Sequence, residues 1–248
     1  MGKLLSFEFR KLFKQKSYYI CTAICLLMGY MTLDRFSGGG GGYGFAQSLV
    51  SAVDISSLTM LLGIWAAIFI CEDYTVGTIR TVISRGYTRT AVFFAKLITL
   101  CCGTVIMLLL CWLVCGLAGI ALFDGSDMDF SISVIFSLAA QLMLVLAYAC
   151  ICNAIASAVQ KTGVAVAVCA VLPVIVFILL AFVDASLYGK GGIFTDVLLE
   201  EYWINDLISA VGNIEPTEES LRLAFNSSGI YIIATVVLGW ISVIKREY

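Results

Sequence analysis

The sequence predicts an all-α membrane protein, with six transmembrane helices in one domain over residues 1–248. Of its residues, 61% are hydrophobic and 13% are charged, which is far more apolar than soluble globular domains are. The mean hydropathy is +1.01. Apolar stretches long enough to cross a bilayer recur along the chain, and basic residues gather between alternate stretches.

The apolar stretches place the crossings, because a transmembrane helix needs about 20 mostly apolar residues. We expect crossings at 17–33, 50–71, 91–122, 132–158, 163–183 and 227–244. The first stretch is longer than the core of a typical signal peptide, and no clear small-residue cleavage site follows it. It is therefore interpreted as a retained first crossing.

The basic residues orient the chain, because loops rich in Lys and Arg stay in the cytoplasm. With both termini in the cytoplasm, all but three of the 15 Lys and Arg residues fall on the cytoplasmic side. The exceptions are Arg35, Lys190 and Arg222. The outer segments collect acids instead: Asp124, Asp127, Asp129, Asp196, Glu200, Glu201, Asp206, Glu215, Glu218 and Glu219. A multi-pass protein with cytoplasmic N and C termini is predicted.

Residues 3–16 predict an amphipathic elbow helix before the first crossing. Its apolar positions at helical spacing are Leu5, Phe9, Leu12 and Phe13. Basic residues surround them: Arg10, Lys11, Lys14 and Lys16. Such a helix lies in the membrane interface, and its charges also anchor the next crossing to anionic lipid; neither role excludes the other.

The glycine run from Gly38 to Gly42 predicts an outer linker, because glycine costs a helix up to about 1 kcal/mol per position relative to alanine. A phosphate-binding Walker loop needs a following Lys and Ser or Thr, whereas Tyr43 and Phe45 follow here. The Walker pattern occurs nowhere else in the chain. Nucleotide binding by this chain is therefore not expected.

Few polar residues lie within the predicted crossings. Asp54 is the only acid firmly inside one, and its distance from the inner end of that helix places it near the outer interface, which favours a structural role. Pro173 should bend the fifth crossing, and Gln141 and Asn153 can bond between helices in the fourth. We interpret these three as packing residues, with lining of a transport path as the alternative.

The ten cysteines lie in or beside predicted crossings, which argues against a disulfide framework. Two pairs, Cys21 with Cys25 and Cys111 with Cys115, share helix faces and raise the alternative of a soft-metal site. The chain has no histidine, and buried free cysteine usually packs as a small apolar residue. No metal or cofactor is expected in this chain.

The segment 184–226 predicts short outer helices between the last two crossings. Apolar residues recur at helical spacing in 193–211, and Pro216 opens a second candidate helix, TEESLRLAF. Glu200 and Glu201 are adjacent, but neighbouring helix residues point about 100° apart. A solvated face is therefore favoured over a catalytic pair.

Residues 75–86 predict a short cytoplasmic helix between the second and third crossings. Ile79, Val82 and Ile83 share one helix face, and we expect this apolar stripe to be buried against lipid or another protein. Gly77 precedes the helix, and Gly86 suits the position after its last residue.

The start of the third crossing contains a candidate helix cap and basic residues. Thr88 can cap the helix, while Arg89 and Lys96 are placed to reach the inner membrane surface along their long side chains. Arg80, Arg85 and Arg89 also act as topology determinants, but topology alone does not require an apolar stripe.

The segment between the second and third crossings resembles the corresponding segment in the permeases of type-2 ABC exporters. The shared pattern is an acid ending the second crossing, then Gly-Thr-Ile-Arg, then Gly-x-Thr-Arg entering the third. Here it consists of Glu72, Gly77, Thr78, Ile79, Arg80, Gly86, Thr88 and Arg89, with Lys96 where the family often has a lysine. The N-terminal FEFRKLFKQKSYY is similar to the family's elbow helix. Motif-level likeness covers 7–19 and 72–96, and the six-crossing layout covers the chain.

The resemblance implies that residues 75–86 form a coupling helix that seats in a groove of a separate ATPase. The implied coupling residues are Glu72, Thr75, Gly77, Thr78, Ile79, Arg80, Val82, Ile83, Arg85, Gly86 and Arg89. It also implies that ATP and Mg²⁺ bind the partner, and that two permease chains, identical or paralogous, form the core. The chain looks most like bacterial permeases for peptide export, including bacteriocin or lantibiotic immunity, bacitracin resistance and toxin secretion.

Together these features predict a permease subunit in the bacterial plasma membrane that exports amphipathic peptides or similar hydrophobic compounds. Its expected partners are the ATPase, a second permease, lipid and substrate, without nucleic acid. A carrier driven by an ion gradient is the first alternative, although few ionisable groups lie within the crossings. A membrane enzyme is disfavoured by the absence of histidine and the scattered acids. A non-transporting immunity or sensor partner stays open.

Overall fold

A computed structural model describes residues 2–37, 45–51, 55–122, 132–187, 199–212 and 216–245. Within these ranges the regular elements are all helical, which confirms the predicted all-α class. In chain order they are α1 (Gly2–Lys14), α2 (Lys16–Ser37), α3 (Phe45–Ser51), α4 (Ile55–Thr75), α5 (Thr78–Ser84), α6 (Arg89–Leu122), α7 (Ile132–Val159), α8 (Thr162–Leu187), the 3₁₀-helix η1 (Leu199–Tyr202), α9 (Ile204–Val211) and α10 (Glu218–Ile244).

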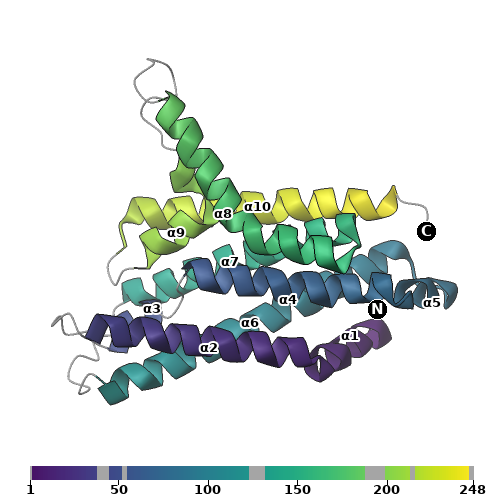
Figure 1. Cartoon of the computed structure of the whole chain (residues 1–248), viewed down its shortest axis with the longest axis horizontal. Coiled ribbons are helices and arrows are strands. Elements are labelled where there is room, and N and C mark those ends of the chain that lie inside the picture. The colour runs from purple at the N-terminus through teal and green to yellow at the C-terminus, as the bar shows by residue number, and fades with distance from the viewer. Residues whose placement is uncertain are drawn as a thin grey trace.

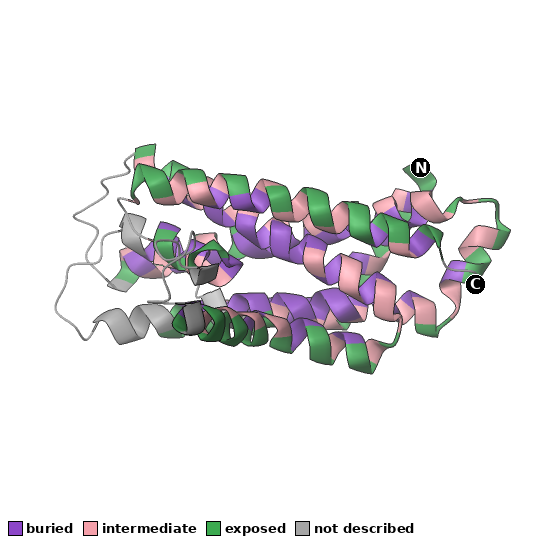
Figure 2. Cartoon of the chain, turned by 90° about the horizontal axis from the view of Figure 1, so that it is seen from above, coloured by how far each residue is buried: buried purple, intermediate pink, exposed green. Residues whose placement is uncertain are grey.

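The long helices lie alongside one another in a bundle (Figure 1). The start of α1, the end of α10 and α5 lie at one end of the bundle, which we call the α5 end. The helices α3 and α9 lie towards the other end, which we call the α9 end. Buried residues lie on the inner faces of the helices, and exposed residues lie on the outside (Figure 2). The largest buried side chains include Trp65 and Phe69 of α4 and Tyr148 of α7.

Five helices in the described part of the chain are long and apolar enough to cross a membrane. They are Leu58–Thr75, Arg89–Ala121, Ile132–Val159, Thr162–Ala185 and Glu218–Ile244. The crossing predicted at 17–33 lies on α2, which runs beside α4 and α6 but is not among these five, so a sixth crossing stays a prediction. Asp54 and the glycine run from Gly38 to Gly42 lie outside the described residues.

Two predicted boundaries are corrected. The second crossing, predicted to end at residue 71, lies on α4, which continues to Thr75. The last crossing begins at Glu218 rather than at 227, so the outer helix predicted over TEESLRLAF is the first part of α10. Thr217 caps this start by accepting a hydrogen bond from the backbone N–H of Ser220 at 3.3 Å.

Close contact between α4 and α8 depends on a glycine. A Cβ atom on Gly63 would lie 2.6 Å from the carbonyl oxygen of Cys169, so a larger residue would force the two helices apart. Tyr148 of α7 donates a hydrogen bond to the same carbonyl at 2.6 Å. Three helices therefore meet around Cys169 in the core.

Pro173 lies inside α8, and this helix bends partway along its length so that its second half leaves the bundle (Figure 1). A proline removes one helical hydrogen bond and clashes with the preceding turn, which accounts for the bend. The second half of α8 is apolar and largely exposed, with Phe182 73% exposed. Its surface is available to lipid or to another chain.

Candidate functional site

The short helix α5 lies between two glycines at the α5 end. Gly77 has φ 76° and Gly86 has φ 88°, a region that side chains other than glycine rarely adopt. The Gly86 N–H donates to the Ile83 carbonyl at 2.9 Å and closes the helix. The helix spans Thr78–Ser84 rather than the predicted 75–86, because Thr75 still belongs to α4.

The apolar stripe of α5 packs against this chain's own helices. Ile79 is 6% exposed, and it lines a small void with Ile83, Val92 and Phe93 of α6 and Val243 of α10. Val82 packs against a cluster formed by α1 and α6, which contains Leu4, Val92 and Ala95. The expectation that this stripe faces lipid or a partner is therefore wrong for Ile79, which α6 and α10 cover, whereas Val82 and Ile83 are half-buried.

The surface that α5 presents outward is polar. Its exposed side chains are Arg80, Thr81 and Ser84, flanked by Val76 and Arg85. The predicted cap at Thr88 is confirmed: its hydroxyl accepts a hydrogen bond from the Ala91 N–H at 3.3 Å. Arg89 is the first residue of α6 and lines the small void beneath Ile79.

A buried ion network lies beside α5, where α1, α4 and α6 meet. Lys96 of α6 is 3% exposed and donates a hydrogen bond to Oδ2 of Asp73, near the end of α4. Lys11 of α1 donates to Oδ1 of the same carboxylate at 2.6 Å. One carboxylate thus holds ammonium groups from two other helices.

The ring of Phe69 supports both cations. The Nζ atoms of Lys11 and Lys96 lie 5.4 and 5.5 Å from the centre of this ring. Cation–π attraction of this kind is stronger where water is excluded. Phe69 is fully buried one turn before Asp73, so the end of α4 carries both the carboxylate and the aromatic ring that hold the two lysines.

Two further carboxylates border the network. Glu72 accepts a hydrogen bond from Gln15 Nε2 at 3.1 Å, and its carboxylate lies 3.6 Å from the Lys11 ammonium group. Glu8 is 2% exposed; its Oε2 lies 4.0 Å from Lys96 Nζ and has no hydrogen-bond partner among the described residues.

The environment of Glu8 favours its protonated form. Burial raises the pKa of Glu8 above its ordinary value, and this effect outweighs the attraction of the Lys96 ammonium group. Beside Glu8, the carboxylates of Glu72 and Asp73 face the ammonium groups of Lys11 and Lys96, and these four groups balance in charge. A buried network tolerates such a balance far better than an unpaired charge.

The network fastens α1 to the ends of α4 and α6. The short linkers on either side of α5 join it to the same two helix ends. The element α5 is therefore joined directly to two of the three helices that the buried charges hold together.

Several predicted roles change in this geometry. Lys96 does not reach the membrane surface; it is buried under α1 and paired. The buried face of α1 carries Leu4, Glu8 and Leu12, whereas Phe13, predicted on the apolar face, is 49% exposed. Leu5 and Phe9 are half-buried, and Arg10 is exposed.

Sequence reasoning missed Glu8 and Asp73. The available signals were an acid spaced four residues from both Leu4 and Leu12, and a lysine within the apolar run of the third crossing. A buried carboxylate near a buried lysine is the ordinary way in which such charges are satisfied. What the sequence did not reveal is which residues lie near each other.

The predicted polar packing residues lie deeper in the bundle. Gln141 is fully buried and donates from Nε2 to the Val50 carbonyl at 3.0 Å, which joins α7 to α3. Asn153 is also buried in α7. The Pro173 carbonyl accepts a hydrogen bond from the Trp203 indole N–H at 3.2 Å, which holds the segment before α9 against α8.

The cysteines and acids form no evident metal centre in the described part of the chain. All ten cysteines lie in described helices and are free. Among the described residues, no three His, Cys, Asp or Glu side chains are grouped so as to hold a metal ion.

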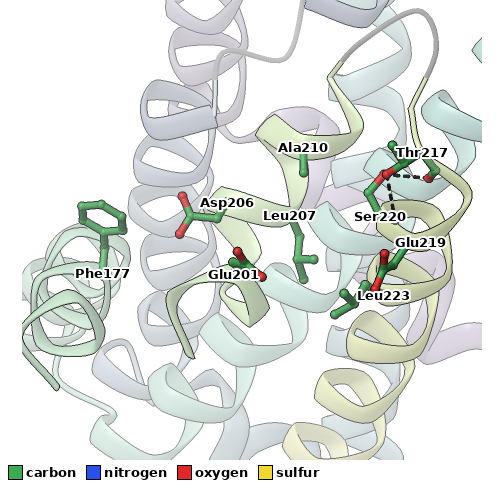
Figure 3. Close-up of a pocket in the computed structure, with 9 residues that line it drawn as sticks. All are labelled: Phe177, Glu201, Asp206, Leu207, Ala210, Thr217, Glu219, Ser220 and Leu223. Carbon is green, nitrogen blue, oxygen red and sulfur yellow. Dashed lines mark hydrogen bonds between the residues drawn. The ribbon is translucent and has the colours of Figure 1, made fainter. Parts of the chain in front are cut away.

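A second feature lies at the α9 end, where a cavity of about 580 Å³ opens between α8, η1–α9 and α10 (Figure 3). Apolar side chains, including Phe177, Leu207 and Leu223, line it together with carboxylates. The carboxylates are Glu201, Asp206 and Glu219. Of the predicted pair Glu200 and Glu201, the structure describes the side chain of Glu201 alone, and it is exposed.

Comparison with known proteins agrees with this architecture. Residues 4–184 match the model of a family described as ABC-2 family transporter protein. The match runs from α1 into the last turns of α8, so it includes α5 and the whole ion network. No curated protein matches the chain significantly. Because the match spans well over half of the chain, the protein belongs to the ABC-2 family of transporters.

Proposed function

We propose that this chain is the permease subunit of an ATP-driven exporter, in which a separate ATPase moves α5 and thereby the ends of α4 and α6. Membership of the ABC-2 family implies a membrane component that works with an ABC ATPase. The observation that carries the proposal is the ion network of Lys11, Asp73 and Lys96, which ties the helices next to α5 into one unit.

The charge distribution supports a cytoplasmic position for the α5 end. Exposed basic side chains on α1 and α5 gather there: Lys3, Arg10, Lys14, Arg80 and Arg85. At the α9 end, the described part of the chain exposes Glu201, Glu218 and Glu219 against one basic residue, Arg222. This asymmetry follows the positive-inside rule and favours the bacterial plasma membrane with both termini inside.

The ATPase contact of this proposal lies on the outward side of α5. Ile79 and Ile83 face α6 and α10, so the exposed side chains of α5, Arg80, Thr81 and Ser84, are left for a partner or for solvent. Arginine is frequent among residues that dominate binding energy at interfaces. The remaining coupling residues have a positioning role: Glu72 and Thr75 lie in the last turn of α4, and Gly77 and Gly86 allow the sharp corners.

Movement would pass from α5 into the bundle because the ion network resists separation of its helices. Breaking a buried pair by removing one partner costs about 3–5 kcal/mol, so displacing the end of α4 carries α1 and α6 with it. Tilting these helices against a second permease, identical or paralogous, would open or close the export path. ATP and Mg²⁺ act on the partner ATPase.

Amphipathic peptides or similar hydrophobic compounds are the proposed cargo. The cavity at the α9 end combines apolar side chains with carboxylates, a lining that is compatible with amphipathic molecules. The exposed apolar half of α8 offers surface for a second permease chain or for lipid.

The test is purification of the permease with the products of its neighbouring genes, followed by reconstitution in vesicles. Arg80→Ala should weaken ATPase binding by about tenfold or more and uncouple ATP hydrolysis from peptide flux in vesicles. Arg10→Ala, an exposed arginine on α1, is the matched control and should leave both unchanged. Failure of any ATPase to associate, or equal effects of the two variants, would contradict the proposal.

The same vesicles separate the alternatives. Transport that persists without ATP and collapses with the proton or sodium gradient would identify an ion-gradient carrier. Stable ATPase association without any flux would identify a non-transporting immunity or sensor partner.

A further inference from the structure

A groove of about 580 Å³ lies between α1 and the α5 corner, which is the segment from the end of α4 to the start of α6. It is separate from the ion network, because Glu8, Lys11, Asp73 and Lys96 do not line it. Its α1 wall includes Lys3 and Phe7, and its other wall includes Val76, Thr78, Thr81 and Arg85. Leu4 and Val82, which pack α5 against α1, form part of its lining, whereas Arg80 of the proposed ATPase contact does not.

The lining of the groove combines positive charge with exposed apolar surface. Lys3 and Arg85 face it from different elements, Thr78 and Thr81 add hydroxyl groups, and no carboxylate lines it. Phe7 is 47% exposed and Val76 is 74% exposed. An occupant complementary to these walls has an anionic oxygen-rich group attached to a hydrophobic chain.

We propose that this groove binds an anionic phospholipid of the adjacent membrane leaflet. Its phosphate lies between Lys3 and Arg85, within reach of the threonine hydroxyls, and an acyl chain lies against Phe7 and Val76. Basic side chains at a membrane surface attract anionic lipids in this way, and arginine and lysine are the usual partners of phosphate.

Lipid is favoured over an acidic protein segment because the helices beside the groove expose apolar side chains together with basic ones. Besides Phe7, the exposed apolar side chains are Phe13 on α1 and Tyr19 and Ile20 at the start of α2. This mixture of exposed aromatic and basic side chains on one helix is typical of helices that lie in the membrane interface.

The groove and the proposed ATPase contact use different sides of α5. Thr78, Thr81, Val82 and Arg85 line the groove and follow one another at helical spacing on one face. Arg80 does not line it. Lipid binding therefore requires only that the chain lies in a membrane, and it can fail or succeed independently of ATPase coupling.

Native mass spectrometry of the delipidated full-length chain tests the proposal. The probes are phosphatidylglycerol and phosphatidylcholine with identical acyl chains. We expect preferential binding of phosphatidylglycerol and a roughly 30-fold loss of its affinity in the Lys3→Ala/Arg85→Ala double variant. The control is Arg10→Ala/Lys14→Ala, which removes the same charge from exposed positions outside the groove. Equal binding of the two lipids, or equal losses in the two double variants, would overturn it.

A second measurement identifies the occupant in native membranes. A benzophenone side chain in place of Phe7 should cross-link phospholipid on illumination, and the Lys3→Ala/Arg85→Ala background should reduce this product. Cross-linking to the ATPase in place of lipid would assign the groove to a protein partner and overturn the lipid proposal. Size-exclusion elution and helical circular dichroism confirm that each variant is folded.

Discussion

Lys96 and Asp73 form a buried ion pair between α6 and the end of α4. They lie 23 residues apart in the chain, and α5 is the element between them. Lys11 joins the pair from α1 through the second oxygen of the carboxylate. The segment from the end of α4 to the start of α6, which contains α5, is thus held in place by these buried ion pairs as well as by the apolar packing of α5.

Removing the lysine should therefore destabilise the whole corner. Lys96→Met leaves Asp73 with one cation instead of two in a buried position, and we expect a loss of about 3–5 kcal/mol in the free energy of unfolding. Thermal unfolding in detergent measures the effect. Arg80→Ala, at an exposed position, should leave stability within about 0.5 kcal/mol of wild type. A Lys96→Met midpoint equal to that of Arg80→Ala would show that the pair contributes nothing.

Coupling within the network can be measured directly. The double variant Asp73→Asn/Lys96→Met removes both charges, so its loss should be smaller than the sum of the two single losses. Additive losses would mean that the two side chains stabilise the protein independently.

Glu8 should give stability a distinct pH dependence. Its pKa is raised by burial, so folded and unfolded chains both hold the proton below the ordinary pKa of 4.5. As the pH rises from there towards the raised pKa, only the folded chain keeps it, and deprotonation increasingly favours the unfolded state. Stability conferred by neutral Glu8 is therefore lost with rising pH across this window.

Glu8→Gln removes this pH dependence without changing size. Its unfolding midpoint, relative to wild type, should rise as the pH increases from about 4.5, because the amide has no proton to lose. A difference between wild type and variant that stays constant, or narrows, over this range would show that Glu8 is charged in the folded protein.

Gly86→Ala tests the corner after α5. Its φ of 88° disfavours any side chain, although a Cβ there would meet no other atom, so the cost is purely conformational. We expect about 1–2 kcal/mol of strain, which the chain can relieve by reorienting α5. ATPase affinity should fall, while Gly163→Ala, which also meets nothing but has a helical backbone, should leave it unchanged. If Gly86→Ala kept full ATPase affinity, ATPase binding would not depend on the backbone conformation at residue 86.

Gly63→Ala tests the contact between α4 and α8. The added methyl group would lie 2.6 Å from the carbonyl oxygen of Cys169. This oxygen belongs to the backbone of α8, which cannot move aside as a flexible side chain can. We expect destabilisation by about 1–3 kcal/mol in thermal unfolding. Gly163→Ala serves as the control again, since alanine is favoured in an open helical position by up to about 1 kcal/mol. Equal midpoints for the two variants would mean that α4 and α8 can separate freely.

The helices of the bundle were largely predictable because local signals encode them. The long apolar runs placed α6, α7 and α8 within a few residues, and two glycines bounded α5. A boundary prediction failed where a helix cap was not visible in hydropathy, because Thr217 starts α10 before its apolar part begins.

The site was less predictable. Hydrophobic spacing correctly put Ile79, Val82 and Ile83 on one face, but spacing does not say what covers that face. Lys96 looked like a residue that reaches the membrane surface, because long lysine side chains at helix ends commonly do so. Its actual environment depends on α1 folding over it, a contact that lies far away in the chain.

The sequence by itself determined that this chain belongs in a membrane. It also determined where α5 lies in the chain and which glycines flank this helix, since hydropathy and glycine conformation act locally. The tertiary structure decided which charges are buried together. Lys11 and Asp73 are 62 residues apart, and only the packing of α1 against α4 and α6 brings their side chains within hydrogen-bonding distance. Burial is a property of that packing, so the pairing of these charges follows from the assembled helices.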